Sequence, residues 1–246
     1  MSHSFGFRVA RNTISVFIPE VCDAIFRLFS DELIQCPSTE SEWKLVAKQF
    51  SEKWNFHHVL GALDGKHIAL RCPPSAGSLY YNYKGFHSIV LMALVDADYK
   101  FLYVDIGASG SSSDDGVFGE TELKEALEAG DIGVPGAEPL PGDGEPVPYF
   151  IIGDDAFPLK SWLMKPFQQR NMTIQEIIYN YRHSRARRVV ENAFGILASR
   201  KLLGLSLLLR KLLGLLLLLR SRKIPLTEDW PGLDGSNGRS NSDVSS

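Results

Sequence analysis

The chain has 246 residues, of which 44% are hydrophobic and 22% are charged, and its formal net charge is -3. This length allows one sizeable core with a small appendage, and the weak net charge by itself gives no sign of nucleic-acid binding. The three cysteines, Cys22, Cys36 and Cys72, are scattered along the chain, which argues against a disulfide framework and favours a reducing compartment.

Two helices are predicted toward the N-terminus. Residues 12–35 carry apolar side chains at helical spacing. Thr39 and Glu42 form a possible capping box before a second apolar stretch that begins at Trp43. Such a pair is either a remnant of a DNA-reading helix-turn-helix or a simple packing unit, and the sequence leaves both interpretations open.

Strand signals follow between residues 58 and 108 and again near residue 150. Residues 58–72 contain two strand-like runs around Asp64-Gly65. The runs SIVLMALVD and KFLYVDIGA, which are joined at residues 96–98, predict a hairpin. The short apolar run PYFIIGD predicts a buried strand.

Two further helices are predicted, one on each side of that last strand. Residues 117–128 read as a short helix with Ser113 or Asp114 as its cap, and a Gly/Pro-rich loop follows at residues 130–148. Residues 184–200 predict the second helix. The order of three antiparallel strands, helix, strand and helix is the opening order of a ribonuclease-H-like α/β fold.

Residues 200–219 are a near-identical tandem repeat, RKLLGLSLLL followed by RKLLGLLLLL. Because Leu is a strong helix former, we expect a helix at residues 200–220 whose apolar surface matches the rest of the fold poorly. Arg210 and Lys211 divide the run into apolar stretches shorter than the roughly 20 residues of a membrane span, so membrane insertion is not expected. An accidental duplication explains the ten-residue period better than packing does.

Charge is distributed unevenly along the chain. Residues 105–155 contain thirteen Asp or Glu and one Lys, whereas residues 179–223 contain eleven Lys or Arg and one acidic residue. An acidic centre beside a basic strip fits a metal site next to a phosphate-binding face, and ordinary uneven surface charge is the alternative.

Four acidic residues stand out because of the elements on which they lie. Asp64 and Asp154 end apolar, β-rich runs, Asp114 lies at a Ser/Gly-rich turn, and Glu191 lies on the last predicted helix. Carboxylates that converge repel one another and require a cation, and their hard oxygens suit Mg²⁺ or Mn²⁺. The pattern therefore indicates a metal-dependent phosphodiester enzyme. For each Asp taken alone, a turn or cap role is the ordinary alternative.

The segments around these acids resemble the PIF/Harbinger superfamily of DDE transposases and the Harbinger transposase-derived nucleases. The resemblance extends from about residue 7 to residue 200. Its matching stretches are WNFHHVLGALDGKHIAL, YYNYKGFHSIVLMALVDADYKFLYVDIGASGSSSDDGVF, YFIIGDDAFPLKSWLMKPF and YNYRHSRARRVVENAFGILASR. Each motif alone is weak, but four motifs in the right order are a strong signal.

The resemblance implies a role for each of the four acids. Asp64, Asp154 and Glu191 would be the catalytic DDE core, and Asp114 would join them as a ligand of divalent metal, either Mg²⁺ or Mn²⁺. The implied reaction is hydrolysis of DNA phosphodiester bonds by a two-metal mechanism. A catalytically inactive, transposon-derived DNA-binding or interaction protein is the alternative function.

Basic residues in the same motifs are candidates for contacts with DNA phosphates, and exposed basic side chains without this role are the alternative. These candidates are Lys66, Lys84, His87, His183, Arg185, Arg187 and Arg188. Family resemblance further implies nuclear localisation, with additional cytoplasmic localisation as the alternative, and a Myb-like DNA-binding partner protein.

We expect four segments along the chain. Residues 1–55 would be a truncated helix-turn-helix-like region, and residues 56–200 the nuclease domain. Residues 201–223 would be the Leu-rich repeat and residues 224–246 a disordered tail. Family members begin well before the region that matches residue 7 and continue beyond residue 200, so we expect the terminal parts of this chain to differ from theirs.

Overall fold

The computed structural model describes residues 10–72, 76–168 and 170–199. The helices are α2 (Arg11–Leu33), α3 (Glu40–Trp54), α4 (Asp114–Gly119), α5 (Glu122–Ala129) and α6 (Ile174–Ser199). The strands are β1 (Val59–Ala69), β2 (Ser88–Val95), β3 (Phe101–Ser109), β4 (Glu138–Pro139), β5 (Pro146–Val147), β6 (Phe150–Ile152) and β7 (Leu163–Met164).

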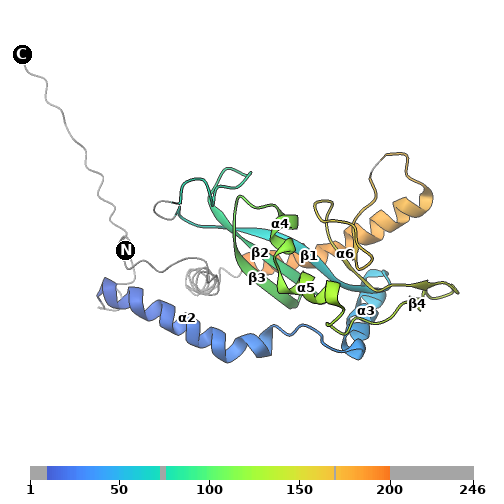
Figure 1. The fold of residues 1–246 in the computed structure, drawn as a ribbon, viewed down its shortest axis with the longest axis horizontal. Coiled ribbons are helices and arrows are strands. Elements are labelled where there is room, and N and C mark those ends of the chain that lie inside the picture. The colour runs from blue at the N-terminus through green and yellow to red at the C-terminus, as the bar shows by residue number, and fades with distance from the viewer. Residues whose placement is uncertain (1–9, 73–75, 169, 200–246) are drawn as a thin grey trace, which may run out of the picture.

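A five-stranded mixed sheet organises the fold, in the order β3-β2-β1-β6-β7. β1, β2 and β3 form an antiparallel meander, whereas β6 runs parallel to β1 and β7 parallel to β6. Figure 1 shows the short helix α4 in front of the sheet and the long helix α6 behind it. This mixed arrangement is a ribonuclease-H-like core and confirms the predicted fold class.

The core lies around β2, in which all eight residues are buried. A continuous apolar run of this kind is typical of a central strand that is covered on both faces. α6 packs on β1 and β2, and α4 packs on β2. α6 buries Val189, Val190 and Phe194 in the same cluster as the strands.

The two N-terminal helices differ in how they use their apolar side chains. α3 begins with the predicted capping box, because Thr39 accepts a hydrogen bond from the backbone of Glu42 and Glu42 accepts one from Thr39. Its Trp43 and Phe50 are fully buried in the main core. α2 extends from the body (Figure 1) and leaves Phe17 and Leu28, among others, exposed.

Several predicted boundaries change in the structure. The segment around Asp64-Gly65 is one continuous strand rather than two runs, and it continues to Ala69. The helix predicted at residues 117–128 is two helices, α4 and α5, the second of which is capped by Thr121. α6 begins ten residues before the predicted start at Ser184.

The Leu-rich repeat and the polar tail lie outside the described residues, so the helix predicted at residues 200–220 and the disorder predicted at residues 224–246 stay predictions. The proposed segment boundaries likewise remain an interpretation. Within the described ranges, no helix has both the length and the apolar character needed to cross a membrane.

Candidate metal centre

Asp64 lies in the middle of β1, at the point where the strand leaves the core. The five residues before it are buried, whereas the rest of the strand is partly or fully exposed. Asp64 pairs with Ala93 of the buried strand β2, so its backbone is held rigidly by the central ladder. Its carboxylate is 16% exposed and therefore sits at the rim of the core.

Gly65 makes room for a second carboxylate. A Cβ atom on Gly65 would lie 2.3 Å from Oδ1 of Asp114, which is far closer than atoms can approach. Asp114 is the first residue of α4, and Ser113 caps that helix by accepting a hydrogen bond from the backbone of Gly116. Since Ser113 is the cap, the Asp114 carboxylate can face β1 instead.

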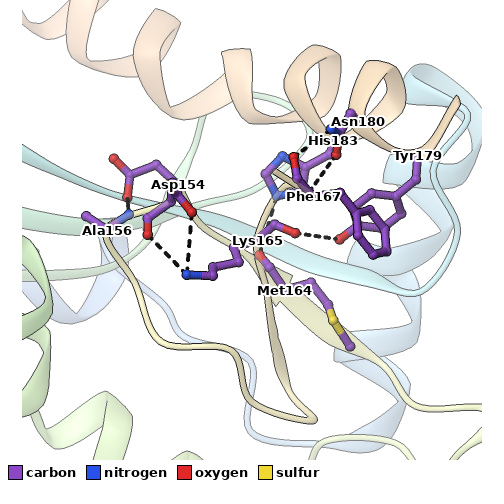
Figure 2. Close-up of polar contacts among 9 residues, drawn as sticks. Asp154, Ala156, Met164, Lys165, Phe167, Tyr179, Asn180 and His183 are labelled. Carbon is purple, nitrogen blue, oxygen red and sulfur yellow. Dashed lines mark hydrogen bonds and ion pairs between the residues drawn. The ribbon is translucent and has the colours of Figure 1, made fainter. Parts of the chain in front are cut away.

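Asp154 follows β6, the strand that runs parallel to β1. The backbone N–H of Gly153 donates to the carbonyl of Met164, and Oδ1 of Asp154 accepts from the backbone of Ala156 at 2.9 Å. These bonds fix the turn after β6, and Figure 2 shows the one between Asp154 and Ala156. Asp154 is therefore carried to the same end of the sheet as Asp64.

The structure brings three of the four predicted acids together. One carboxylate oxygen each from Asp64, Asp114 and Asp154 lies within 4.8 Å of the others, and all three side chains are partly buried. Among the described residues this group has three members, and Glu191 lies outside it. The carboxylate group is therefore built from β1, the start of α4 and the turn after β6.

Glu191 lies beside this group and is joined to it by an arginine. Nη2 of Arg187 is 3.5 Å from Oδ1 of Asp64 and 3.7 Å from Oε1 of Glu191, which is one helical turn further along α6. The Glu191 side chain is 55% exposed. Its predicted roles as metal ligand and catalytic residue stay predictions.

Burial and mutual repulsion disfavour ionisation of the carboxylate group. Burial raises the pKa of Asp64 to about 6, Arg187 opposes the rise, and the charges of Asp154 and Asp114 add to it. Burial also raises the pKa of Asp114, with Asp154 as the next cause. Carboxylates in such an environment gain stability from a cation placed among them.

Arg187 is the functional residue that the sequence places differently. The sequence suggested a DNA-backbone contact, but the guanidinium reaches inward to Asp64 and Glu191. Its Nε is buried and has no hydrogen-bond partner among the described residues. The only sequence signal for this role is the four-residue spacing between Arg187 and Glu191 on one helix.

His183 corrects another prediction. It was a candidate for phosphate contact, yet its side chain is 2% exposed and its Nε2 lies 3.4 Å from the carbonyl oxygen of Met164. Burial lowers its pKa to about 4, so this histidine is neutral at physiological pH. His183 is therefore part of the packing between α6 and β7. Arg185 and Arg188 are exposed on α6.

A pocket of about 430 Å³ opens between α6 and the segment that follows β7. Its lining includes Asp155, Phe167, Asn180 and Arg187. Figure 2 shows Asn180 holding this segment, because its side chain accepts from the backbone N–H of Phe167 at 2.8 Å and donates to the Phe167 carbonyl at 2.9 Å. The pocket thus has a fixed wall and reaches the acidic group through Arg187.

Comparisons with known proteins agree with this geometry. Residues 63–201 match the family model described as DDE superfamily endonuclease. The human protein named "Putative nuclease HARBI1" is 27% identical over 192 residues, which is 78% of this chain and 50% of that protein. The Arabidopsis thaliana "Protein ALP1-like" is 31% identical over 159 residues, which is 63% of this chain and 38% of that protein.

The chain thus spans about half the length or less of the curated relatives that it matches. No solved structure matches it. The family model covers more than half of the chain and includes all four predicted acids. The resemblance inferred from the sequence is confirmed: the chain belongs to the DDE superfamily endonuclease family.

Proposed function

We propose that this protein is a divalent-metal-dependent nuclease that hydrolyses phosphodiester bonds in DNA. The observation that carries the proposal is the convergence of Asp64, Asp114 and Asp154, whose oxygens lie within 4.8 Å of one another. Membership of the endonuclease family and similarity to a protein named as a nuclease support the same function.

The donor set fits Mg²⁺ or Mn²⁺. All three donors are carboxylates, which supply hard oxygens and negative charge, and burial and mutual repulsion raise the pKa values of Asp64 and Asp114. These residues would hold divalent ions, and a pair of such ions would supply activation of a water molecule and stabilisation of the leaving 3′ oxygen. We assign Asp64, Asp114, Asp154 and Glu191 as the ligands.

The chain's own residues hold this arrangement in place. Asp64 and Asp154 are carried by hydrogen-bonded parallel strands, so their separation is fixed by the sheet. Arg187 stands behind Asp64, favours its ionised form, and orients Glu191 from α6. Asp64, Asp154 and Glu191 form the proposed catalytic core.

Exposed basic residues lie on elements that also carry the acidic group or its partner Arg187, or follow such an element, and their charge complements a DNA backbone. Arg185 and Arg188 lie on α6, and Lys66 and Lys84 lie at and beyond the exposed end of β1. Such contacts position nucleic acid without reading its sequence. A DNA substrate also makes the nucleus the proposed location, which imaging of a tagged chain tests.

Cleavage of supercoiled plasmid by the purified chain tests the proposed function. We expect nicking with Mg²⁺ or Mn²⁺, none with EDTA, and none with Asp154→Asn. The control Asp143→Asn removes a carboxylate from the exposed loop between β4 and β5 and should cleave like the wild type. Equal cleavage by the wild type and Asp154→Asn would show that the activity does not come from this site.

A further inference from the structure

The segment between β1 and β2 contains a turn that presents an aromatic and a basic side chain to solvent. Residues 82–85 form this turn, and the backbone N–H of Gly85 donates to the carbonyl of Asn82 at 3.1 Å. Tyr83 is 83% exposed, and Nζ of Lys84 lies 5.2 Å from the centre of its ring. A large aromatic ring with this exposure is free to make a contact with a ligand.

Buried polar residues hold the turn in one conformation. Asn82, which is 2% exposed, accepts hydrogen bonds from the backbone of Lys84 and Phe86 and donates to Oγ of Ser88 at 2.7 Å. Oγ of Ser88 in turn lies 2.9 Å from Nδ1 of His67. The turn is therefore tied to β1 through a continuous chain of hydrogen bonds.

His67 lies between the turn and the acidic group. Side chains two residues apart lie on the same face of a strand, so His67 shares the face of Gly65, which touches Asp114. The rings of His67 and Tyr83 meet edge to face, with centroids 5.5 Å apart. Burial is the main cause of the lowered pKa of His67 and of the raised pKa of Asp114, but the charge of Lys84 also acts on both groups and therefore lies near the acidic group.

We propose that the turn at residues 82–85, hereafter the Tyr83 turn, binds an unpaired nucleotide of the DNA next to the cleaved phosphate. The Tyr83 ring stacks on the base, and the Lys84 ammonium contacts an adjoining phosphate. This inference rests on the proposed function, because it takes DNA to be the substrate of the acidic group. It adds a substrate class, namely DNA with unpaired nucleotides at the cleavage site.

The chemistry of the turn favours an unpaired nucleotide over duplex DNA. Within a duplex, both faces of a base are covered by its neighbours, so an aromatic side chain stacks only on a base that has left the helix. Proteins that bind single-stranded nucleic acid combine aromatic side chains, which stack on bases, with basic side chains, which contact phosphates. His67 and the Asn82 network hold the ring in place, so little freedom is lost on binding.

Binding without cleavage tests the proposal directly. The full chain, in EDTA, is titrated into a fluorescein-labelled duplex with a single-stranded extension, and into the same DNA with abasic sites throughout the extension. The wild type should bind the first DNA about 5- to 150-fold more tightly, the range that one stacked base provides. Tyr83→Ala should bind both equally, whereas Tyr83→Phe should retain the preference.

Matched variants separate stacking from charge. Tyr99→Ala removes a partly exposed tyrosine from the turn at the other end of β2 and should leave the preference unchanged. Lys84→Ala should weaken the binding of both DNAs to the same extent. The slope of log binding constant against log salt concentration should become shallower by about 0.7. Lys48→Ala, an exposed lysine on α3, should do neither.

The outcomes distinguish this inference from the proposed function. If the wild type cleaves plasmid and Tyr83→Ala keeps the preference for the DNA with bases, the proposed role of the Tyr83 turn is wrong and the proposed nuclease function stands. If Tyr83→Ala loses the preference but the wild type does not cleave plasmid, the role of the Tyr83 turn in binding is supported and the proposed nuclease function is wrong. No binding of either DNA by the wild type would overturn the inference and favour a protein partner for this surface.

Discussion

β2 and the exposed half of β1 are hydrogen-bonded neighbours in one sheet, yet their side chains have opposite effects on the fold. Every residue of β2 is buried and apolar or small, so the strand contributes stability. The facing half of β1 carries Asp64, whose neighbours Asp114 and Asp154 repel it. This difference indicates that the rigid, apolar strand β2 holds Asp64 in place against the repulsion of the other two carboxylates.

The largest expected effect is the loss of stability that follows truncation of an apolar side chain in β2. Leu94 is fully buried in β2 and packs on Gly61 of β1. Leu94→Ala should lower the free energy of unfolding by about 2–5 kcal/mol, because it leaves a cavity that the sheet cannot close. Chemical denaturation measures this.

Leu45→Ala is the matched control, since Leu45 is 58% exposed on α3 and its truncation should change stability by less than about 0.5 kcal/mol. Equal losses for Leu94→Ala and Leu45→Ala would contradict the role given to β2.

The second effect is a pH dependence that comes from His183. Its pKa is lowered to about 4 by burial, so between about pH 4 and 6.5 the unfolded chain binds a proton that the folded chain does not. Stability is therefore complete above about pH 6.5 and falls by up to about 3 kcal/mol as the pH drops toward 4.

His183→Gln should remove this part of the pH dependence, as measured by denaturation across the same range. His87→Gln, which changes a less buried histidine, should keep it. An identical pH profile for the wild type and His183→Gln would show that His183 is not buried in its neutral form.

A third effect concerns the contact between β1 and α4. Gly65→Ala places a methyl group where Oδ1 of Asp114 lies, and the carboxylate must move away. Because a side chain can give way, the stability cost should be about 1 kcal/mol, whereas Mn²⁺ affinity should fall at least ~10-fold. Calorimetric titration measures the affinity.

Gly195→Ala on α6, where nothing lies within 4 Å of an added Cβ atom, should keep the wild-type affinity and stabilise the helix slightly. Unchanged Mn²⁺ affinity in Gly65→Ala would mean that Asp114 is not a ligand.

A fourth effect is a gain of stability when one carboxylate of the repelling group is removed. The folded-state pKa of Asp64 is raised to about 6, so its contribution to stability is complete below about pH 4 and is lost as the pH rises through 6. In EDTA, Asp64→Asn should therefore melt at a higher temperature than the wild type above pH 6, with little difference at pH 4.

Asp131→Asn, which changes an exposed carboxylate after α5, should leave the melting temperature unaltered at both pH values. A lower melting temperature for Asp64→Asn above pH 6 would make Asp64 a structural residue rather than one of a repelling group.

The sequence was informative where local chemistry decides the structure. The apolar run of β2, the capping box at Thr39 and the hairpin turn after β2 all appear as predicted. The first turns of α6 were missed, although Thr173 and Glu176 carry the same signature and form the corresponding hydrogen bonds. Exposed Ile174 and Ile177 obscure the amphipathic pattern there.

The site was only partly predictable, because it depends on contacts between distant elements. The sequence identified Asp64, Asp114 and Asp154 through their motifs, and the structure brings them together. It did not reveal Arg187 between Asp64 and Glu191, since an arginine on a basic helix has the same pattern whether it faces DNA or the core. The two-residue strand β7 is too short to show any periodicity.

The central claim is that Asp64, Asp114 and Asp154 form a metal site, and one measurement tests it most directly. The melting temperatures of the wild type and Asp154→Asn are compared in EDTA and in excess Mn²⁺. A ligand at ~100 times its Kd stabilises the folded chain by about 2.7 kcal/mol, so the wild type should melt several degrees higher with Mn²⁺ and the variant should not. An equal Mn²⁺ shift in both proteins, or none in the wild type, would contradict the account.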